Sequence, residues 1–308
     1  MDSTAVTGAP FFSVVIPAWN RQSLVGRTIR SCLAQDFQDF EIVIVDDGST
    51  DDTRGAVLAF GDPRIRYIRQ DNAGASAARN RGGAEARGRY IAFLDSDDEF
   101  LPGKLSAFHA AIGVTGSEVC WYSPLWFHRG DGNRLLKPER PIAEGERVGD
   151  YLFASDGLMQ TSTLVIPRDL FLKVGFDPAL RTLEDLDLCL RLEAAGGRFR
   201  MVPGAQVVWY DDTPVGRLSY TVTPDHVLRW ARDARGLMSR RAQAGFLARH
   251  AAPGLMRKSP LRAVGMLCRA VATGGLSAPR AGTLLLRGIA PGAYGRLRDG
   301  VVRRRASA

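Results

Sequence analysis

The sequence predicts an α/β protein with a mostly parallel central sheet flanked by helices, followed by a helical, basic C-terminal extension. Two observations support this prediction. In the first half of the chain, short continuous apolar runs rich in β-branched residues alternate with segments of helical spacing, which is typical of buried parallel strands joined by crossover helices. Beyond about residue 216, apolar residues instead recur every three or four positions among many arginines.

Four strands are expected in the first 112 residues, with helices between them. The strands are "FSVVIP" (12–17), "EIVIV" (41–45), "RIRYI" (64–68) and "RYIAFL" (89–94). The helices are expected at about 24–33, 51–60 and 75–86. Parallel strands place ligands at their carboxyl ends, so the residues that follow these four strands should face one crevice.

The pattern changes after residue 113. Strands are expected at 118–127, within 155–167 and at 206–210, and helices at 168–180 and 183–196. We therefore predict one α/β domain over residues 1–216, with a change of pattern between a first half at about 10–112 and a second half at about 113–216. Residues 217–308 form the basic, mainly helical C-terminal region, in which 224–250 is expected to be one helix.

The composition is that of a soluble globular protein. The chain has 308 residues, of which 45% are hydrophobic and 24% charged. Its four cysteines are scattered without metal-type spacing, so we expect reduced thiols. No secretory signal or membrane-spanning helix is visible. We expect a cytoplasmic protein, with peripheral attachment to the inner face of the cell membrane as an option.

Charge divides the chain into two parts. From Arg217 to the end there are 18 Arg and Lys against 3 acidic residues, a balance of +15, which leaves −7 for residues 1–216 of the total of +8. The basic region has two open interpretations: an interfacial contact with anionic lipid, or a helical appendage packed on the catalytic domain. Nucleic acid is not an expected partner, because no recognised binding module accompanies the arginines.

The fourth predicted strand ends in an acidic cluster. In "GRYIAFLDSDDEFLP" four acids occupy five positions, and their repulsion calls for a positive partner. If the chain stays extended there, the carboxylates of Asp95 and Asp97 point to the same side. Such a pair suits Mg²⁺ or Mn²⁺, and leaves the ion free to bind a substrate diphosphate. The alternative is a solvated acidic turn.

The other strand ends carry residues suited to a nucleotide. Arg79 could pair with a phosphate or form a surface ion pair, and Gly74 and Ala75 let the backbone approach a nucleotide closely. Asp47 either hydrogen-bonds a base or ribose or caps the following helix.

Five segments, taken in order, resemble the family 2 glycosyltransferases. They are "SVVIPAWN", "IVIVDDGSTDDT", "NAGASAARNRG", "YIAFLDSDDEF" and "LEDLDLCLRL". Members of this family are inverting enzymes of the GT-A fold that use nucleotide-diphosphate sugars. The resemblance covers about residues 10–220. It implies that residues 1–216 are a catalytic domain, with a nucleotide-binding half at about 10–112 and an acceptor half at about 113–216.

The resemblance implies a role for each matching residue. Asp95 would contact the sugar nucleotide, Asp97 would ligate Mn²⁺ or Mg²⁺ with Asp95 beside it, and Asp185 would be the catalytic base. Glu184 would orient that base or bind an acceptor hydroxyl; without the resemblance, both acids could simply favour a helix N-terminus. The donor-binding set is Pro17, Ala18, Asn20, Asp46, Asp47, Asn72, Gly74, Arg79, Asp95 and Ser96.

Two features depart from the family pattern. Processive members carry Gln-x-x-Arg-Trp, whereas this chain has "HVLRW" with His226 in place of Gln, which indicates a non-processive enzyme. Many relatives place a His after the last strand, near the metal. Here Asp211 and Asp212 stand in that region, which leaves a third protein ligand in doubt.

The leading hypothesis is a metal-dependent, inverting transferase that moves a sugar, expected to come from a UDP-sugar, to an acceptor hydroxyl in cell-surface glycan synthesis. The acceptor would be a glycan or a lipid-linked oligosaccharide, or a small molecule. One alternative is transfer to a polyprenyl phosphate, and another is a non-catalytic nucleotide-sugar-binding or membrane-adaptor protein. A receiver-type phosphorylation domain is disfavoured because no lysine stands at a late strand end.

Overall fold

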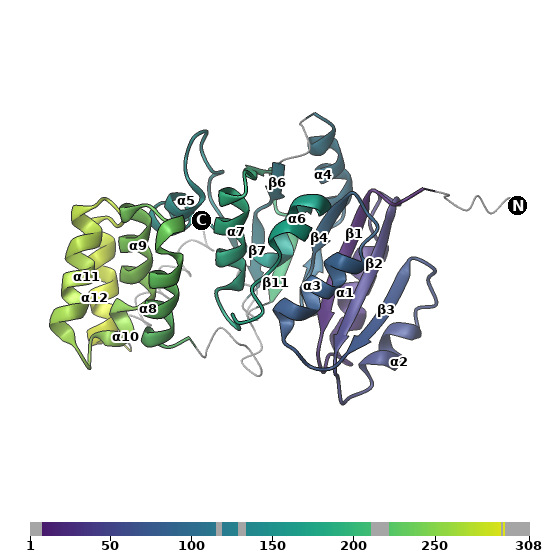
Figure 1. The fold of residues 1–308 in the computed structure, drawn as a ribbon, viewed down its shortest axis with the longest axis horizontal. Helices are drawn as coiled ribbons and strands as arrows, with labels where there is room; N and C mark the ends of the chain where they lie inside the picture. The colour runs from purple at the N-terminus through teal and green to yellow at the C-terminus, as the bar shows by residue number, and fades with distance from the viewer. Residues whose placement is uncertain (1–7, 115–118, 129–133, 211–221, 291, 293–308) are drawn as a thin grey trace, which may run out of the picture. The chain divides into compact units, whose positions relative to one another are not determined.

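The computed structural model describes residues 8–114, 119–128, 134–210, 222–290 and 292 (Figure 1). The chain divides into two compact units. The first comprises Met1–Phe127 and Met159–Tyr210, and the second comprises His128–Leu158 and Asp211–Ala308. Residues 128–158 therefore belong to the second unit by contacts, although the sequence pattern placed them in the acceptor half.

A seven-stranded sheet forms the centre of the first unit, with the order β10-β6-β9-β4-β1-β2-β3. All neighbouring strands are parallel except β9, which is antiparallel to both β4 and β6. The mostly parallel sheet predicted from the sequence is thus confirmed. The strands are β1 (Phe12–Ala18), β2 (Phe40–Asp47), β3 (Ile65–Gln70), β4 (Tyr90–Phe93), β6 (Val119–Tyr122), β9 (Val165–Pro167) and β10 (Arg198–Met201).

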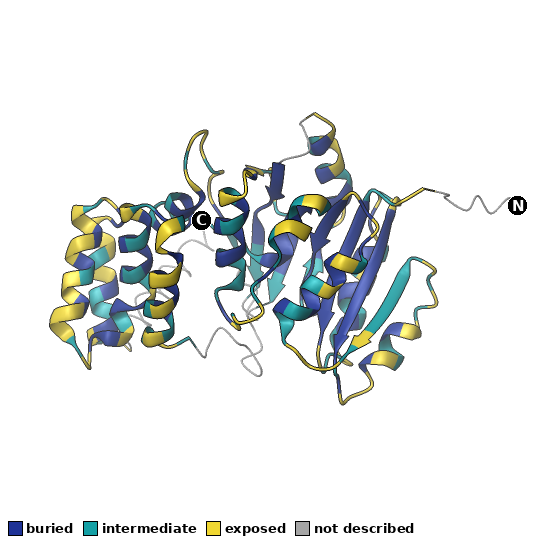
Figure 2. Cartoon of the chain, viewed as in Figure 1, coloured by how far each residue is buried: buried dark blue, intermediate teal, exposed yellow. Residues whose placement is uncertain are grey.

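Burial follows the apolar runs. Every residue of β1, β2 and β4 is buried, whereas the edge strand β3 is mostly intermediate (Figure 2). The helix that follows β3 packs closely against β1, because a Cβ atom at Gly82 would lie only 2.4 Å from Val15. The helices of this unit are α1 (Val25–Leu33), α2 (Thr53–Leu58), α3 (Ala75–Glu85), α4 (Lys104–Gly113), α6 (Arg168–Val174) and α7 (Glu184–Ala194).

Two expected strands differ from the structure. The run 118–127 is interrupted at Ser123–Pro124, because proline has no N–H to donate, and gives β6 in the large sheet and β7 (Leu125–His128) in a smaller one. That smaller sheet also contains β5 (Glu99–Phe100) and β11 (Val207–Tyr210). The run 155–167 is a strand only at β9, and a 3₁₀ turn (Thr161–Thr163) precedes it.

The second unit is mainly helical. The single helix expected over 224–250 is wrong: the backbone is extended at Met238, and the Ser239 hydroxyl caps a new helix by accepting the N–H of Ala242 at 2.9 Å. Aromatic packing among Phe153, Trp230 and Phe246 fills its core. Its elements are β8 (Arg134–Lys137), α5 (Val148–Ala154), α8 (Pro224–Asp233), α9 (Arg240–His250), α10 (Ala252–Leu255), α11 (Pro260–Ala272) and α12 (Ala278–Ile289).

None of the helices within the described ranges combines the length and the hydropathy that a bilayer crossing requires.

Candidate active site

The ends of β1 and β2 are joined by the side chain of Asn20. This residue adopts a positive φ of 51°, and its Oδ1 accepts the N–H of Thr50 at 2.8 Å. Its own N–H donates to the Ser49 hydroxyl at 2.9 Å. Pro17 and Ala18 lie in the buried end of β1, beside β2. Asn20 therefore holds together the first two strand ends of the predicted ligand edge.

Asp46 is buried at the end of β2. It accepts a short hydrogen bond from the Tyr67 hydroxyl, and Arg69 lies 3.7 Å away. Burial and the contact with Asp46 raise the pKa of Tyr67 to about 12, so this phenol keeps its proton at neutral pH. Asp46 thus connects the end of β2 to the side chains of Tyr67 and Arg69. A contact between Asp46 and the donor stays a prediction.

Asp47 organises the loop that leads into α3. Its carboxylate accepts the backbone N–H groups of Ala73 at 2.9 Å and Gly74 at 2.8 Å, and the Gln70 side-chain amide at 2.7 Å. The side chain of Asn72 donates to the Asp47 carbonyl oxygen at 2.9 Å. Gly74 has φ of 94°, a conformation that favours glycine. Three predicted donor-binding residues therefore lie together here, while contact of Asp47 with a base or ribose stays a prediction.

Arg79 links three elements of the first unit. It lies on α3, is only 5% exposed, and donates to Asp95 at 2.7 Å and to Glu184 at 3.2 Å. Its guanidinium also lies 5.1 Å from the centre of the Phe176 ring. The two carboxylates raise the pKa of Arg79 against the opposing effect of burial. Arg79 thus forms ion pairs with two acids that the sequence predicted separately, one after β4 and one at the start of α7.

The chain turns directly after β4. The N–H of Asp98 donates to the carbonyl oxygen of Asp95 at 3.0 Å, with Ser96 and Asp97 in the turn between them. The backbone is therefore not extended between Asp95 and Asp97. The expectation that their carboxylates point to the same side required an extended backbone. A tight turn gives the two carboxylates different environments.

Those environments differ in charge and in access. Asp95 accepts hydrogen bonds from Arg79 and from the side-chain amide of Gln160, the latter at 3.1 Å, and its side chain is 22% exposed. The Asp97 side chain is 34% exposed, and the guanidinium of Arg21 lies 3.7 Å from it. Asp97 is therefore the more accessible of the two acids.

A polar cluster beneath the turn holds the acids in place. Asp98 is buried and accepts the Ser162 hydroxyl at 2.6 Å and the Gln160 amide at 3.3 Å. Burial, together with the nearby acids, raises the pKa of Asp98 well above its usual value. The ammonium of buried Lys104 donates to the Ser162 carbonyl oxygen at 2.7 Å. Gln160 and Ser162 are functional candidates that the sequence did not predict, because the pattern of 155–167 indicates only a strand.

Arg27 supports the turn from the side of α1 and was also missed. Its Nη2 donates to the carbonyl oxygen of Asp97 at 2.5 Å, and its Nε lies 3.0 Å from the Glu99 carboxylate. The same guanidinium stacks over the Tyr210 ring at 3.7 Å. The positive partners that the acidic strand end requires are therefore arginines, and the sequence showed them only as polar positions on a helix.

The start of α7 is strained and carries the predicted catalytic pair. Leu183 adopts φ of 67°, a left-handed conformation that a branched side chain rarely takes. The next two residues, Glu184 and Asp185, open the helix. Burial, reinforced by the charge of Glu184, raises the pKa of Asp185 to about 7. A carboxylate with such a pKa can accept a proton at neutral pH.

The acidic turn fits a divalent ion that is shared with a ligand. No group of three or more His, Cys, Asp and Glu side chains in the described ranges could hold a metal on its own. Mg²⁺ and Mn²⁺ commonly bind one or two carboxylates and complete their shell with phosphate oxygens and water. The accessible carboxylate of Asp97 meets that requirement. Asp211 and Asp212 lie outside the described residues.

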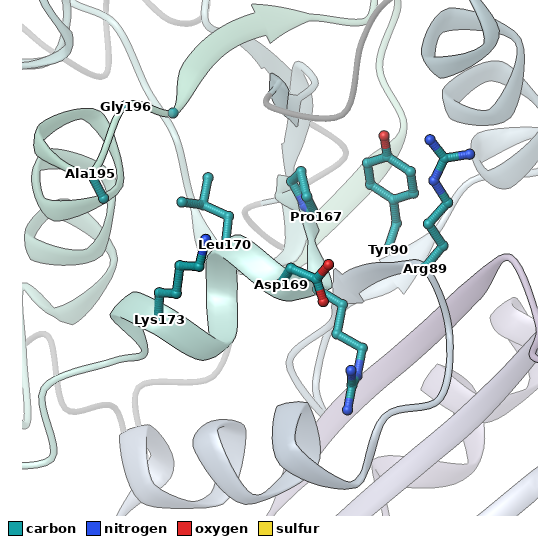
Figure 3. Close-up of a pocket in the computed structure, with 10 residues that line it drawn as sticks. Arg89, Tyr90, Pro167, Asp169, Leu170, Lys173, Ala195 and Gly196 are labelled. Atoms are coloured by element: carbon teal, nitrogen blue, oxygen red, sulfur yellow. The ribbon is translucent and has the colours of Figure 1, made fainter.

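A pocket of about 350 Å³ lies at the other end of β4 (Figure 3). Tyr90, the first residue of β4, lines it together with α6 and the turn after α7. Asp95 is five positions beyond Tyr90, which in extended chain is a span of about 16 Å. The pocket is thus distinct from the predicted site and contains none of the predicted residues.

The strand order, the acidic turn after β4 and the carboxylates that open α7 define the class: a nucleotide-sugar transferase fold of the GT-A type. The chain belongs to glycosyltransferase family 2. The family profile described as "Glycosyl transferase family 2" matches residues 13–170. The crystal structure of S. aureus TarS residues 1–349 in complex with UDP-GlcNAc superposes with a TM-score of 0.67 at 20% identity, over 89% of this chain and 84% of that 1–349 chain.

Several curated relatives match the sequence. The succinoglycan biosynthesis protein ExoO of Rhizobium meliloti is 33% identical over 84% of this chain and 74% of its own length. The putative colanic acid biosynthesis glycosyl transferase WcaA of Escherichia coli is 47% identical, over 59% of this chain and 66% of its own. A Campylobacter jejuni "GalNAc(5)-diNAcBac-PP-undecaprenol beta-1,3-glucosyltransferase" is 44% identical over 32% of this chain and 33% of its own.

Proposed function

We propose that this protein is a metal-dependent, inverting, non-processive glycosyltransferase. It moves a sugar from a nucleotide-diphosphate sugar, a UDP-sugar in our proposal, to an acceptor hydroxyl in cell-surface glycan synthesis. Family membership supports sugar transfer. The UDP-GlcNAc bound to TarS supports a nucleotide-sugar donor. The names of ExoO and WcaA support a role in cell-surface glycan synthesis.

The observation that carries the mechanism is the environment of Asp185. Its carboxylate is adjacent to Glu184, which Arg79 connects to the acidic turn after β4. A pKa of about 7 allows Asp185 to be ionised before the reaction and to take up a proton during it. This combination is what an inverting transfer to a hydroxyl group requires.

In the proposed reaction, Asp185 accepts the proton of the acceptor hydroxyl as its oxygen attacks the anomeric carbon. A new C–O bond forms on the acceptor side, and the bond between the anomeric carbon and the diphosphate breaks. Glu184, held by Arg79, keeps negative charge beside the base and so maintains its raised pKa. Asp97 would hold the divalent ion, whose chemical contribution is to neutralise charge on the leaving diphosphate.

The name of the Campylobacter relative makes lipid-linked glycans a reasonable acceptor class for this chain. Transfer to a polyprenyl phosphate is the second candidate. A phosphate acceptor carries no proton that must be removed, so it needs little help from a base. Near-normal turnover by Asp185→Asn would favour that alternative over transfer to a hydroxyl.

The test begins with a thermal-shift screen of nucleotide sugars in the presence of Mn²⁺. One donor should raise the melting temperature in a Mn²⁺-dependent way. That donor, supplied with an extract of acceptor glycans, should then yield nucleoside diphosphate. Stabilisation by no nucleotide sugar would contradict the donor assignment, and donor binding without any nucleoside diphosphate would favour the non-catalytic alternative.

A further inference from the structure

Helix α11 of the second unit presents an apolar stripe to solvent. Leu261 is 89% exposed, Val264 is 40% exposed and Val271 is 37% exposed, and Cys268 is also exposed. These four residues follow one another at spacings of three, four and three. At 3.6 residues per turn they fall within an arc of about 80° on one side of the helix.

The core-facing side of α11 is a different set of residues. Ala263, Leu267 and Ala270 are buried within the second unit. Because these residues already anchor the helix, the exposed stripe is additional apolar surface that the unit itself leaves uncovered. A lone exposed leucine needs no explanation, but an aligned series on one helix marks a contact surface.

Positive charge lies on the same exposed side of the helix. Arg262 and Arg269, seven residues apart, lie about 80–100° around the helix from Leu261, and Arg257 and Lys258 precede the helix; all four are exposed. The sequence has twelve Arg and Lys between residues 234 and 298 and no Asp or Glu. A covering partner must therefore offer apolar material for the stripe and negative charge for its border.

We propose that this face of α11, defined by Leu261, Val264, Cys268 and Val271, enters the headgroup region of an anionic lipid bilayer. Arg262 and Arg269 would meet the lipid headgroups. An anionic bilayer supplies both of the required chemistries in one surface. A second copy of this chain fits less well, since it would bring the same excess of positive charge to the contact. The inference goes beyond sugar transfer, because it involves neither donor nor acceptor.

Flotation of the full chain with vesicles tests the proposal without any reaction. The vesicles are phosphatidylcholine alone, or phosphatidylcholine with an equal part of phosphatidylglycerol. We expect the protein to float with the anionic vesicles only, and the bound fraction to fall as salt rises. Equal binding to both vesicle types, or to neither, would overturn the proposal.

Matched variants identify the face. Leu261→Asp should reduce the vesicle partition coefficient at least about tenfold. The double variant Arg262→Gln/Arg269→Gln should reduce it about twentyfold to thirtyfold, since each basic residue near such a surface contributes about fivefold. The control Leu58→Asp changes a leucine on α2 that is 53% exposed, and it should bind like the wild type.

Two further measurements separate the remaining outcomes. Far-UV circular dichroism and thermal unfolding should match the wild type for each variant, because the altered side chains are exposed. Sedimentation velocity reports self-association of the wild type and of Leu261→Asp. The proposal would be contradicted if the wild type floated with vesicles and none of the α11 variants weakened that binding. It would also be contradicted if the wild type did not bind vesicles but formed an oligomer that Leu261→Asp dissociates.

Discussion

The guanidinium of Arg79 lies 2.7 Å from the carboxylate of Asp95, although one residue is on α3 and the other follows β4. A second hydrogen bond from Arg79 reaches Glu184 at the start of α7. One buried cation therefore fixes the separation between the acidic turn and the predicted base. Without it, two carboxylates would face each other in a poorly solvated site.

Replacement of Arg79 by alanine should destabilise the protein and abolish transfer. Removing one partner of a buried ion pair costs about 3–5 kcal/mol, because the remaining charge is left uncompensated. Thermal or denaturant unfolding and nucleoside diphosphate release would measure the two effects. The control Arg81→Ala lies on the same helix, where its exposed guanidinium pairs with Glu85, and it should change stability by less than about 1 kcal/mol. Equal effects of the two variants would refute the role given to Arg79.

The rate of transfer should depend on the ionisation of Asp185. Because this residue acts as a base only when ionised, kcat/KM should fall about tenfold for each pH unit below a pKa of about 7. Asp185→Asn should lower kcat by about 10²–10⁴-fold and remove this acid limb. Glu193→Gln, in the last turn of the same helix, provides the control. An acid limb that persists in Asp185→Asn would exclude this assignment.

Asp185 should also influence stability in a direction opposite to its effect on rate. Its pKa is raised in the folded protein, so between about pH 4 and 7 the folded state holds a proton that the unfolded state has lost. The free energy of unfolding contributed by this group should therefore fall as pH rises through that window. Asp185→Asn should match the wild type near pH 4 and exceed its stability near pH 8. Denaturant unfolding at both pH values measures this difference, and a variant that is less stable than the wild type at pH 8 would contradict the prediction.

Replacement of the carboxylate by an amide should have different effects at Asp97 and at Asp95. Asp97→Asn removes the accessible carboxylate, so Mn²⁺-supported donor binding should weaken by at least about 10–100-fold with little change in stability. Asp95→Asn should instead lower the melting temperature, because Arg79 loses its nearest partner. Calorimetric donor titrations with Mn²⁺ and with EDTA measure the first effect, and Asp36→Asn, an exposed substitution, is the control. Donor binding by the wild type that EDTA leaves unchanged would tell against a metal at Asp97.

Gln160 should act as a positioning residue. Its amide bridges the carboxylates of Asp95 and Asp98, and its Oε1 accepts the N–H of Ser162 at 2.8 Å. Gln160→Ala should lower kcat/KM about tenfold or more through displacement of these acids, while leaving the pH at which Asp185 titrates nearly unchanged. Gln22→Ala, at an exposed position, is the matched control. Wild-type kinetics in Gln160→Ala would remove this residue from the site.

The sequence predicted the first four strands well because each is a local pattern, whereas β5, β8 and β10 were not predicted. The apolar run 12–17 became β1 at Phe12–Ala18, and 41–45 became β2 at Phe40–Asp47. The break in the helix expected over 224–250 was missed, because an apolar period can continue through a capping serine such as Ser239. Periodicity describes which side is buried, and it says little about where the backbone changes direction.

The site was predictable as a set of residues but not as a set of contacts. Strand-end acids and the pair that opens α7 are visible in the motifs. Their connection is not, since Arg79 and Glu184 are 105 residues apart. Gln160 gave no signal, because a single amide side chain near a short strand has many structural uses. Long-range pairing depends on the folded topology, and local patterns do not encode it.

Crystals of the protein grown with Mn²⁺ and the donor identified by the thermal-shift screen would test the central claim most directly. The measurement is the anomalous difference density of manganese together with the position of the sugar. We predict a manganese peak beside the Asp97 carboxylate and the donor diphosphate, with the anomeric carbon facing Asp185. Manganese bound away from Asp97, or a nucleotide sugar seated in the pocket beside Tyr90, would contradict it.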